Sequence, residues 1–292
     1  MADSITYSIA GHLIRIEGDR ECAALRSIPG FPVFVATGGE PEWQVIFGRE
    51  IPRPKDWTIL YHFQFEIGTM SWTLAKVGDT YYCVMDPYDT ADTPLLMRYE
   101  LGSQIVEGTV CADPIMLRFA LWMAVGMLSC SSNMVLIHSS CVVHQGKAVL
   151  CLGESGTGKS THTRLWLKYI PDSFLLNDDS PVLAFENGQA VVYGSPWSGK
   201  THHFHQLRFP LAAAIRLSQA PHNKIRRLGI LEAFSALQPS FPPALAQDDK
   251  FQDMMVGMLS EVLSVARVFH LECLPDEAAA RTSHDAIFGP LR

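Results

Sequence analysis

The sequence contains no apolar run long enough to cross a bilayer. A membrane-spanning helix needs roughly 20 apolar residues, and the most hydrophobic stretch, Phe119–Leu128, is shorter than that. The N-terminal segment Met1–Ser4 lacks the basic region and apolar run of a secretory signal. The seven cysteines include no Cys-x-x-Cys pair, so we expect buried thiols rather than a disulfide framework. These absences predict a cytoplasmic protein without a membrane partner.

Charged residues are also scarce, at 18% of the 292-residue chain, and the formal net charge is −7. An acidic protein has no general attraction for nucleic acid, so we expect no nucleic-acid partner and only local recognition of phosphate. No internal repeat or low-complexity tract is present. Hydrophobic residues make up 48% of the chain, which is enough for one large domain or two small ones.

Residues 1–112 are predicted to be rich in β-strands. Short β-branched and aromatic runs, such as Leu13–Ile16, Trp43–Phe47 and Tyr81–Met85, alternate with glycine, proline and aspartate turns. No chemical motif stands out there. We expect an accessory domain that packs on the catalytic part or on a second subunit, so a homo-oligomer is one possible state.

Residues 113–292 predict an α/β (α+β) domain. A helix over about 114–128 precedes a strand at Met134–Ile137 and a hairpin that turns at Gln145-Gly146. A helix from Lys159 to about Tyr169 comes next, and a buried strand follows at Phe174–Leu176. The later elements are a hairpin over 181–193 that turns at Asn187-Gly188, a helix with a methionine stripe over 251–263, a strand at 268–271 and a helix over 276–288.

A glycine-rich loop follows the strand that ends at Leu152. It fits Gly-x-x-x-x-Gly-Lys-Ser, the Walker A pattern, between an apolar strand and a helix. Glycines let backbone N–H groups curl around phosphate oxygens, and the helix adds its positive end. We expect the loop and the next residue to bind ATP: Gly153, Glu154, Ser155, Gly156, Thr157, Gly158, Lys159, Ser160 and Thr161.

Within this loop, Lys159 should neutralise the β- and γ-phosphates and the Ser160 hydroxyl should bind Mg²⁺. The alternative is a glycine turn that arises by chance, which the flanking strand and helix argue against. The loop alone does not separate a kinase from a GTPase, an ATPase or a passive nucleotide sensor.

Two adjacent carboxylates, Asp178 and Asp179, come directly after a buried strand. A carboxylate at the end of a neighbouring strand holds the metal in many phosphate-loop proteins. Of two such groups, one can bind Mg²⁺ while the other takes the proton of an attacking hydroxyl. The alternative is an Asx turn or a helix cap, which Asn-Asp-Asp-Ser-Pro also fits.

Two further features adjoin these motifs. His138 ends a predicted strand, where a lone histidine is usually structural. A second loop, 194–202, is rich in glycine, serine and lysine and could donate N–H groups and an ammonium to a phosphate or an acceptor. Its candidate substrate-binding residues are Ser198, Gly199, Lys200 and His202.

Taken together, residues 138–200 resemble the catalytic domain of HPr kinase/phosphorylase and, more distantly, ATP-dependent phosphoenolpyruvate carboxykinase. The resemblance is carried by His138, 21 residues before Lys159, by the glycine loop, by the Asp178-Asp179 pair and by the loop at 194–202. The run 219–237 also looks like HPr-kinase-related bacterial proteins of unassigned substrate. In all, the resemblance covers about residues 130–290.

The resemblance implies a phosphate-loop kinase fold with a mixed sheet. It makes Asp178 the general base, Asp179 a metal-side carboxylate and His138 a residue that senses or positions the phosphate. The chain departs from the family in two places. The loop at 194–202 lacks the arginine-containing signature through which HPr kinase handles its protein substrate, and residues 1–112 do not match that family's regulatory domain.

We therefore predict an Mg·ATP-dependent kinase that acts on a hydroxyl of a small metabolite or on a serine of a peptide or protein. Asp178→Asn is expected to spare nucleotide binding and remove turnover. A carboxykinase-like lyase and a nucleotide-binding regulatory protein without chemistry are the alternatives. Arg208, Arg226 and Arg227 are candidates for stabilising charge in the transition state, and the alternative for each is a solvated surface residue.

Overall fold

The computed structural model describes residues 2–64, 70–88, 93–111, 113–199, 201 and 203–291. The chain forms two compact units. The first comprises residues 1–132 and 244–252, and the second comprises residues 133–243 and 253–292. No helix in the described ranges combines the length and the hydropathy that a membrane span requires.

The first unit is built on one mixed eight-stranded sheet, in the order β1-β2-β3-β8-β7-β6-β5-β4. Strand β3 runs parallel to both of its neighbours, and the other pairs are antiparallel. The strands are β1 (Ser4–Ile9), β2 (His12–Glu17), β3 (Trp43–Ile46), β4 (Thr58–Gln64), β5 (Met70–Val77), β6 (Thr80–Pro87), β7 (Leu95–Glu100) and β8 (Ile105–Gly108). The helices are α1 (Asp19–Leu25), η1 (Phe31–Phe34), α2 (Pro114–Cys130) and η3 (Leu245–Gln247).

Helix α2 belongs to this first unit. Its start is set locally, because Pro114 suits the first helical turn and the Asp113 side chain accepts a 2.7 Å hydrogen bond from the Met116 amide. Its apolar side chains pack on the sheet, where Phe119 meets Trp72 edge to face. The division between the units therefore falls after residue 132 and not after residue 112, where the composition of the sequence changes.

The segment 244–252 returns to the first unit because of one buried carboxylate. Asp248 is 1% exposed and accepts hydrogen bonds from the Tyr81 hydroxyl at 2.7 Å and from the Lys76 ammonium. Phe251 packs edge to face on Tyr81. Helix α5 (Asp249–Val265) thus begins in the first unit and ends in the second.

The second unit contains a mixed nine-stranded sheet. Four strands pair in the order β12-β10-β11-β15. The long strand β15 then pairs with β17, which pairs with β16. The first residues of β15 pair instead with β14, and the order continues to β13 and β9. The strands are β9 (Met134–Leu136), β10 (Ser140–His144), β11 (Lys147–Leu152), β12 (Phe174–Asn177), β13 (Val182–Glu186), β14 (Gln189–Tyr193), β15 (Arg208–Gln219), β16 (Lys224–Arg227) and β17 (Arg267–Cys273). The remaining elements are α3 (Lys159–Tyr169), α4 (Ile230–Leu237), η2 (Gln238–Ser240) and α6 (Glu277–Phe288).

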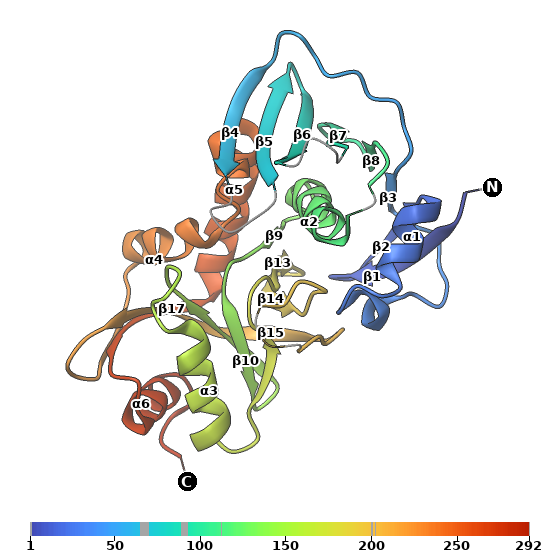
Figure 1. Cartoon of the computed structure of the whole chain (residues 1–292). Coiled ribbons are helices and arrows are strands. Elements are labelled where there is room, and N and C mark those ends of the chain that lie inside the picture. Colours follow the sequence, from blue (N-terminus) through green and yellow to red (C-terminus); the bar gives the residue numbers. More distant parts are fainter. Residues whose placement is uncertain are drawn as a thin grey trace. The chain divides into compact units, whose positions relative to one another are not determined.

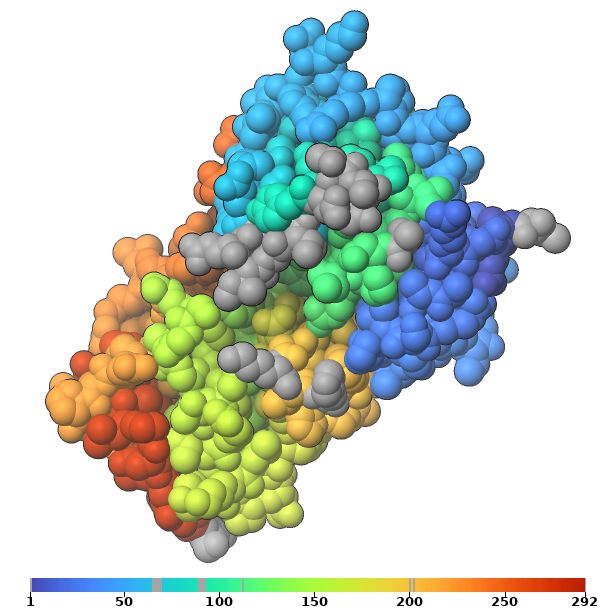
Figure 2. Space-filling model, in the orientation of Figure 1, coloured from blue at the N-terminus to red at the C-terminus, as the bar shows by residue number. Residues whose placement is uncertain are grey.

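Helices α3 and α6 lie side by side against this sheet (Figure 1). They bury an apolar core that includes Trp166, Ile215, Leu217, Leu271 and Ile287. In Figure 2 the yellow-green surface of α3 adjoins the red surface of α6. Every second residue of β15 faces this core, so its alternate residues face the opposite side of the sheet.

The strand directions bring several strand ends to one edge. Strands β11, β15 and β17 are parallel, and β12 has the same direction because both it and β11 are antiparallel to β10. The carboxyl ends of these four strands and the beginning of β10 therefore meet at the edge where the glycine loop starts.

Both predicted hairpins are confirmed. Gln145 and Gly146 have φ angles of 49° and 69°, and Asn187 and Gly188 have 49° and 75°. Two consecutive residues with positive φ are what the tight turn of a two-residue hairpin requires. The helix predicted from Lys159 to Tyr169 is also confirmed, and the chain as a whole is an α/β structure with two mixed sheets.

Candidate functional site

The loop between β11 and α3 has the backbone geometry of an anion cradle. Gly156 and Gly158 adopt φ angles of 82° and 105°, which favour glycine, and a Cβ on Gly153 would lie 2.5 Å from the Thr157 hydroxyl. Within the described part of the chain, no protein acceptor takes the N–H groups of Gly156, Gly158, Lys159 or Ser160. These groups can therefore donate to an anion at the positive end of α3.

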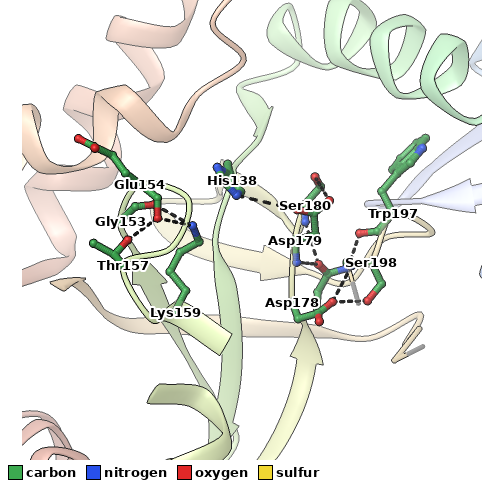
Figure 3. Close-up of polar contacts among 12 residues, drawn as sticks. His138, Gly153, Glu154, Thr157, Lys159, Asp178, Asp179, Ser180, Trp197 and Ser198 are labelled. Carbon is green, nitrogen blue, oxygen red and sulfur yellow. Dashed lines mark hydrogen bonds and ion pairs between the residues drawn. The ribbon is translucent and has the colours of Figure 1, made fainter. Parts of the chain in front are cut away.

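Lys159 places its ammonium inside this loop. The side chain is largely buried, and Nζ donates to the carbonyls of Gly153 at 2.8 Å and Glu154 at 3.2 Å (Figure 3). Burial lowers the pKa of Lys159, the charge of Asp179 opposes that change, and the charge of Arg216 adds to it. Both of these charged side chains therefore lie close to the glycine loop.

His138 and Asp179 form the next part of the site. His138 Nε2 lies 4.0 Å from Asp179 Oδ1, and Figure 3 draws the ring between Lys159 and Asp179. The backbone holds both residues, since the His138 amide donates to Ser240 and the Ser139 amide donates to the Asp179 carbonyl. Burial and the charge of Lys159 lower the pKa of His138, and the charge of Asp179 opposes that change.

Asp178 points to a different set of partners. Its carboxylate accepts hydrogen bonds from the Ser198 hydroxyl, from the Gly199 amide at 2.7 Å, and from both the amide and the hydroxyl of Thr201. Burial alone would raise the pKa of Asp178, but the bonds from Ser198, Thr201 and Gly199 hold it below its ordinary value. Four donors occupy all four lone-pair sites of the carboxylate.

The loop that follows β14 is therefore fixed to the aspartate pair. Asn177 reinforces it, because its side-chain amide donates to the carbonyls of Trp197 at 3.0 Å and Ser195 at 3.3 Å. Ser198 and Gly199, both candidate substrate-binding residues, contact Asp178, whereas Lys200 and His202 lie outside the described residues. Thr201 was not singled out from the sequence, where a threonine beyond a glycine-lysine pair carries no signal of its own.

A pocket of about 540 Å³ opens beside the glycine loop. Gly156, Gly158 and Thr161 line one side, and the apolar side chains of Leu165, Leu217, Ala220, Leu274 and Pro275 line much of the rest. Gln219 and Cys273 add polar atoms. An apolar pocket with a few polar groups suits a planar base and a sugar.

The residues present also fit a magnesium ion bound together with a nucleotide. Among the described residues, no three histidine, cysteine or carboxylate side chains gather into a metal site. Magnesium, however, takes one or two protein ligands and completes its shell with phosphate oxygens and water. The exposed Ser160 hydroxyl, in the first turn of α3, and the Asp179 carboxylate supply oxygen ligands of that kind at one edge of the sheet.

Two of the three arginines singled out from the sequence lie in ion pairs with carboxylates. Arg208 lies in an ion pair with Glu186 and also donates to the Tyr193 hydroxyl, within the β13–β14 region. Arg226 pairs with Glu232. Arg216, which the sequence did not single out, lies 3.6 Å from Glu154 of the glycine loop. Its position depends on the parallel register that pairs it with Leu152.

The likeness of this chain to known proteins is weak and lies in structure rather than in sequence. No protein-family model matches the chain, and no curated protein sequence matches it. Among solved structures, the chain is similar to the Hpr(Ser) kinase/phosphatase from Coxiella burnetii, with 15% sequence identity and a TM-score of 0.27. The aligned region covers 49% of this chain and 87% of that one. At this similarity, function has to be inferred from the geometry of the site.

Proposed function

We propose that this protein is an ATP-dependent kinase that transfers the γ-phosphoryl group to a hydroxyl acceptor. One observation carries the proposal. The glycine loop, with its buried lysine and with backbone N–H groups that no acceptor in the described residues takes, lies at the same sheet edge as His138 and the carboxylate of Asp179. Phosphoryl transfer depends on such positioning and charge stabilisation more than on covalent chemistry by the protein.

In this proposal the loop binds the phosphate chain and the adjoining pocket takes the nucleoside. The amides of Gly156, Gly158, Lys159 and Ser160 donate to phosphate oxygens, and the Lys159 ammonium stabilises charge on the transferring group. Ser160 would hold Mg²⁺, which would neutralise charge on the phosphate oxygens when it is bound.

The acceptor oxygen forms a bond to the γ-phosphorus while the bond from that phosphorus to the bridging oxygen breaks. ADP leaves with the electron pair, and the hydroxyl proton passes to a carboxylate. Asp179 suits the role of proton acceptor better than Asp178, because the Asp178 carboxylate already accepts four hydrogen bonds from residues of the 198–201 loop. The resemblance to HPr kinase favours Asp178, and that assignment stays a prediction.

The experiment compares Lys159→Ala with Lys168→Ala, which removes an exposed lysine from the last turn of the same helix. Nucleotide affinity is measured by titration calorimetry, and transfer is followed with γ-labelled ATP and fractionated bacterial extract. We expect Lys159→Ala to lose both binding and transfer and Lys168→Ala to keep both. Tight nucleotide binding without phosphoryl loss from ATP in any fraction would instead indicate a regulatory protein.

A further inference from the structure

Three basic residues lie in one row across three neighbouring strands of the second unit. Arg216 on β15 is in register with His270 on β17, and His270 is in register with Arg226 on β16. Because paired residues share a face, the three side chains lie on one side of the sheet. This is the side opposite the core with α3 and α6, which takes the alternate residues Ile215, Leu217 and Leu271.

This basic row (Arg216, His270, Arg226) begins at the glycine loop. Arg216 is paired with Leu152, the last residue of β11, and its guanidinium lies 3.6 Å from the Glu154 carboxylate. The row therefore runs outward from the glycine loop, along a face that the proposed nucleoside pocket does not use.

The row also lines a hollow of about 430 Å³. Helix α4 also lines it, through Leu231, Glu232, Ser235 and Ala236, as does Leu228. Figure 2 shows the orange surface of this segment exposed next to the yellow-green surface of the loop and α3. A hollow of this volume has room for a small molecule.

The hollow contains two arginines although the chain as a whole carries a net charge of −7. Each arginine pairs with one carboxylate, Arg216 with Glu154 and Arg226 with Glu232, and both glutamates are largely exposed. Each guanidinium has five N–H donors, so these single carboxylates leave donors unused on both arginines. Arginine pairs in this arrangement suit the flat, two-oxygen edge of a carboxylate or the oxygens of a phosphate.

We propose that this hollow binds the phosphoryl acceptor, and that the acceptor is a small hydroxyl compound carrying a carboxylate or phosphate group. The proposal rests on the kinase activity proposed above and names the substrate class for that activity. Arg226 and Arg216 hold the anionic group while the hydroxyl reaches the γ-phosphate at the glycine loop.

The first test separates acceptors by charge. A bacterial extract is divided into macromolecules, small molecules retained by an anion exchanger at neutral pH, and small molecules that pass through it. Each fraction is incubated with the protein, Mg²⁺ and γ-labelled ATP. We expect label to appear on a compound of the retained fraction alone.

Label on a compound from the unretained or macromolecular fraction would overturn the inference and leave the kinase activity standing. Absence of transfer from every fraction would contradict the kinase activity itself, and the acceptor site would fall with it. The two failures are thus distinguishable.

The second test compares Arg226, which lines the hollow, with Arg281, an exposed arginine on α6. With the acceptor from the retained fraction, Arg226→Gln should raise the acceptor KM by about tenfold or more, since a charged hydrogen bond is lost. The KM for ATP and kcat should not change, Arg226→Lys should recover part of the affinity, and Arg281→Gln should behave as wild type. Equal acceptor KM values for Arg226→Gln and Arg281→Gln would refute the assignment.

Discussion

Substituting the two adjacent aspartates one at a time tests the division of roles at the site. In Asp178→Asn, one of the two accepting oxygens becomes an NH₂ group, which cannot accept a hydrogen bond. If Oδ1 is replaced, the donors of Ser198 and Gly199 lose their acceptor; if Oδ2 is replaced, the two donors of Thr201 lose theirs. Each hydrogen bond to a charged group contributes about 1.5–3 kcal/mol, and the substitution removes two of them. We expect a loss of about 3 kcal/mol in the free energy of unfolding of the second unit.

That loss corresponds to a fall of roughly 6–12 °C in the melting temperature for a unit of this size. In Asp179→Asn the cost should stay below about 1 kcal/mol, because the side chain is 39% exposed and the hydrogen bond from the Ser180 hydroxyl is long, at 3.3 Å. Turnover should fall by a factor of about 100 to 10,000 in Asp179→Asn, which is the usual contribution of a general base. Nucleotide affinity should be retained in Asp179→Asn, because the amides of the loop are unaffected.

Thermal unfolding, nucleotide titration and phosphoryl transfer from γ-labelled ATP are measured on both variants. Asp253→Asn, an exposed aspartate on α5, serves as the control for loss of one negative charge. The reasoning is refuted if Asp178→Asn abolishes turnover at an unchanged melting temperature while Asp179→Asn keeps turnover. In that case Asp178 is the base that the family resemblance implies.

Three further predictions concern the pocket, a close contact and a buried histidine. Cys273 is the one cysteine of the seven that is not buried, and it lines the nucleoside pocket. Bound ATP should therefore slow the reaction of this thiol with a maleimide, while inorganic triphosphate should not. Equal slowing by both compounds would mean that the nucleoside binds elsewhere. A Cβ on Gly194 would lie 1.9 Å from the His205 carbonyl oxygen, so Gly194→Ala should lower the free energy of unfolding by about 2 kcal/mol or more. A Cβ on Gly257, within helix α5, meets nothing within 4 Å, so Gly257→Ala should raise it by about 0.5–1 kcal/mol. Chemical denaturation measures both changes. Burial lowers the pKa of His162 to about 4, so the folded protein binds fewer protons at this residue than the unfolded chain does. The free energy of unfolding should therefore fall by up to about 3 kcal/mol as the pH drops from 6.5 to 4. A His162→Gln protein with the same pH dependence of stability as the wild type would contradict this.

Local turn chemistry accounts for what could be predicted from the sequence. The Gln145-Gly146 and Asn187-Gly188 turns need positive φ at both positions, and these residue types provide it at little cost. The glycine loop is likewise a local feature, since its glycines and the helix start at Lys159 lie within a few residues of each other. Such signals depend on near neighbours in the chain and can be read without the fold.

Tertiary contacts decided the rest, because they join residues far apart in the chain. Asp178 looks like a free base in the sequence, yet four donors from 198–201 occupy its carboxylate only after β14 has brought that loop back to β12. Arg216 gains its place beside Glu154 from the parallel register of β11 and β15. The segment 244–252 joins the first unit because the buried Asp248 finds Lys76 and Tyr81 there. The spacing of residues sets turns and loops, but pairing across strands is settled by burial and hydrogen bonding over the whole chain.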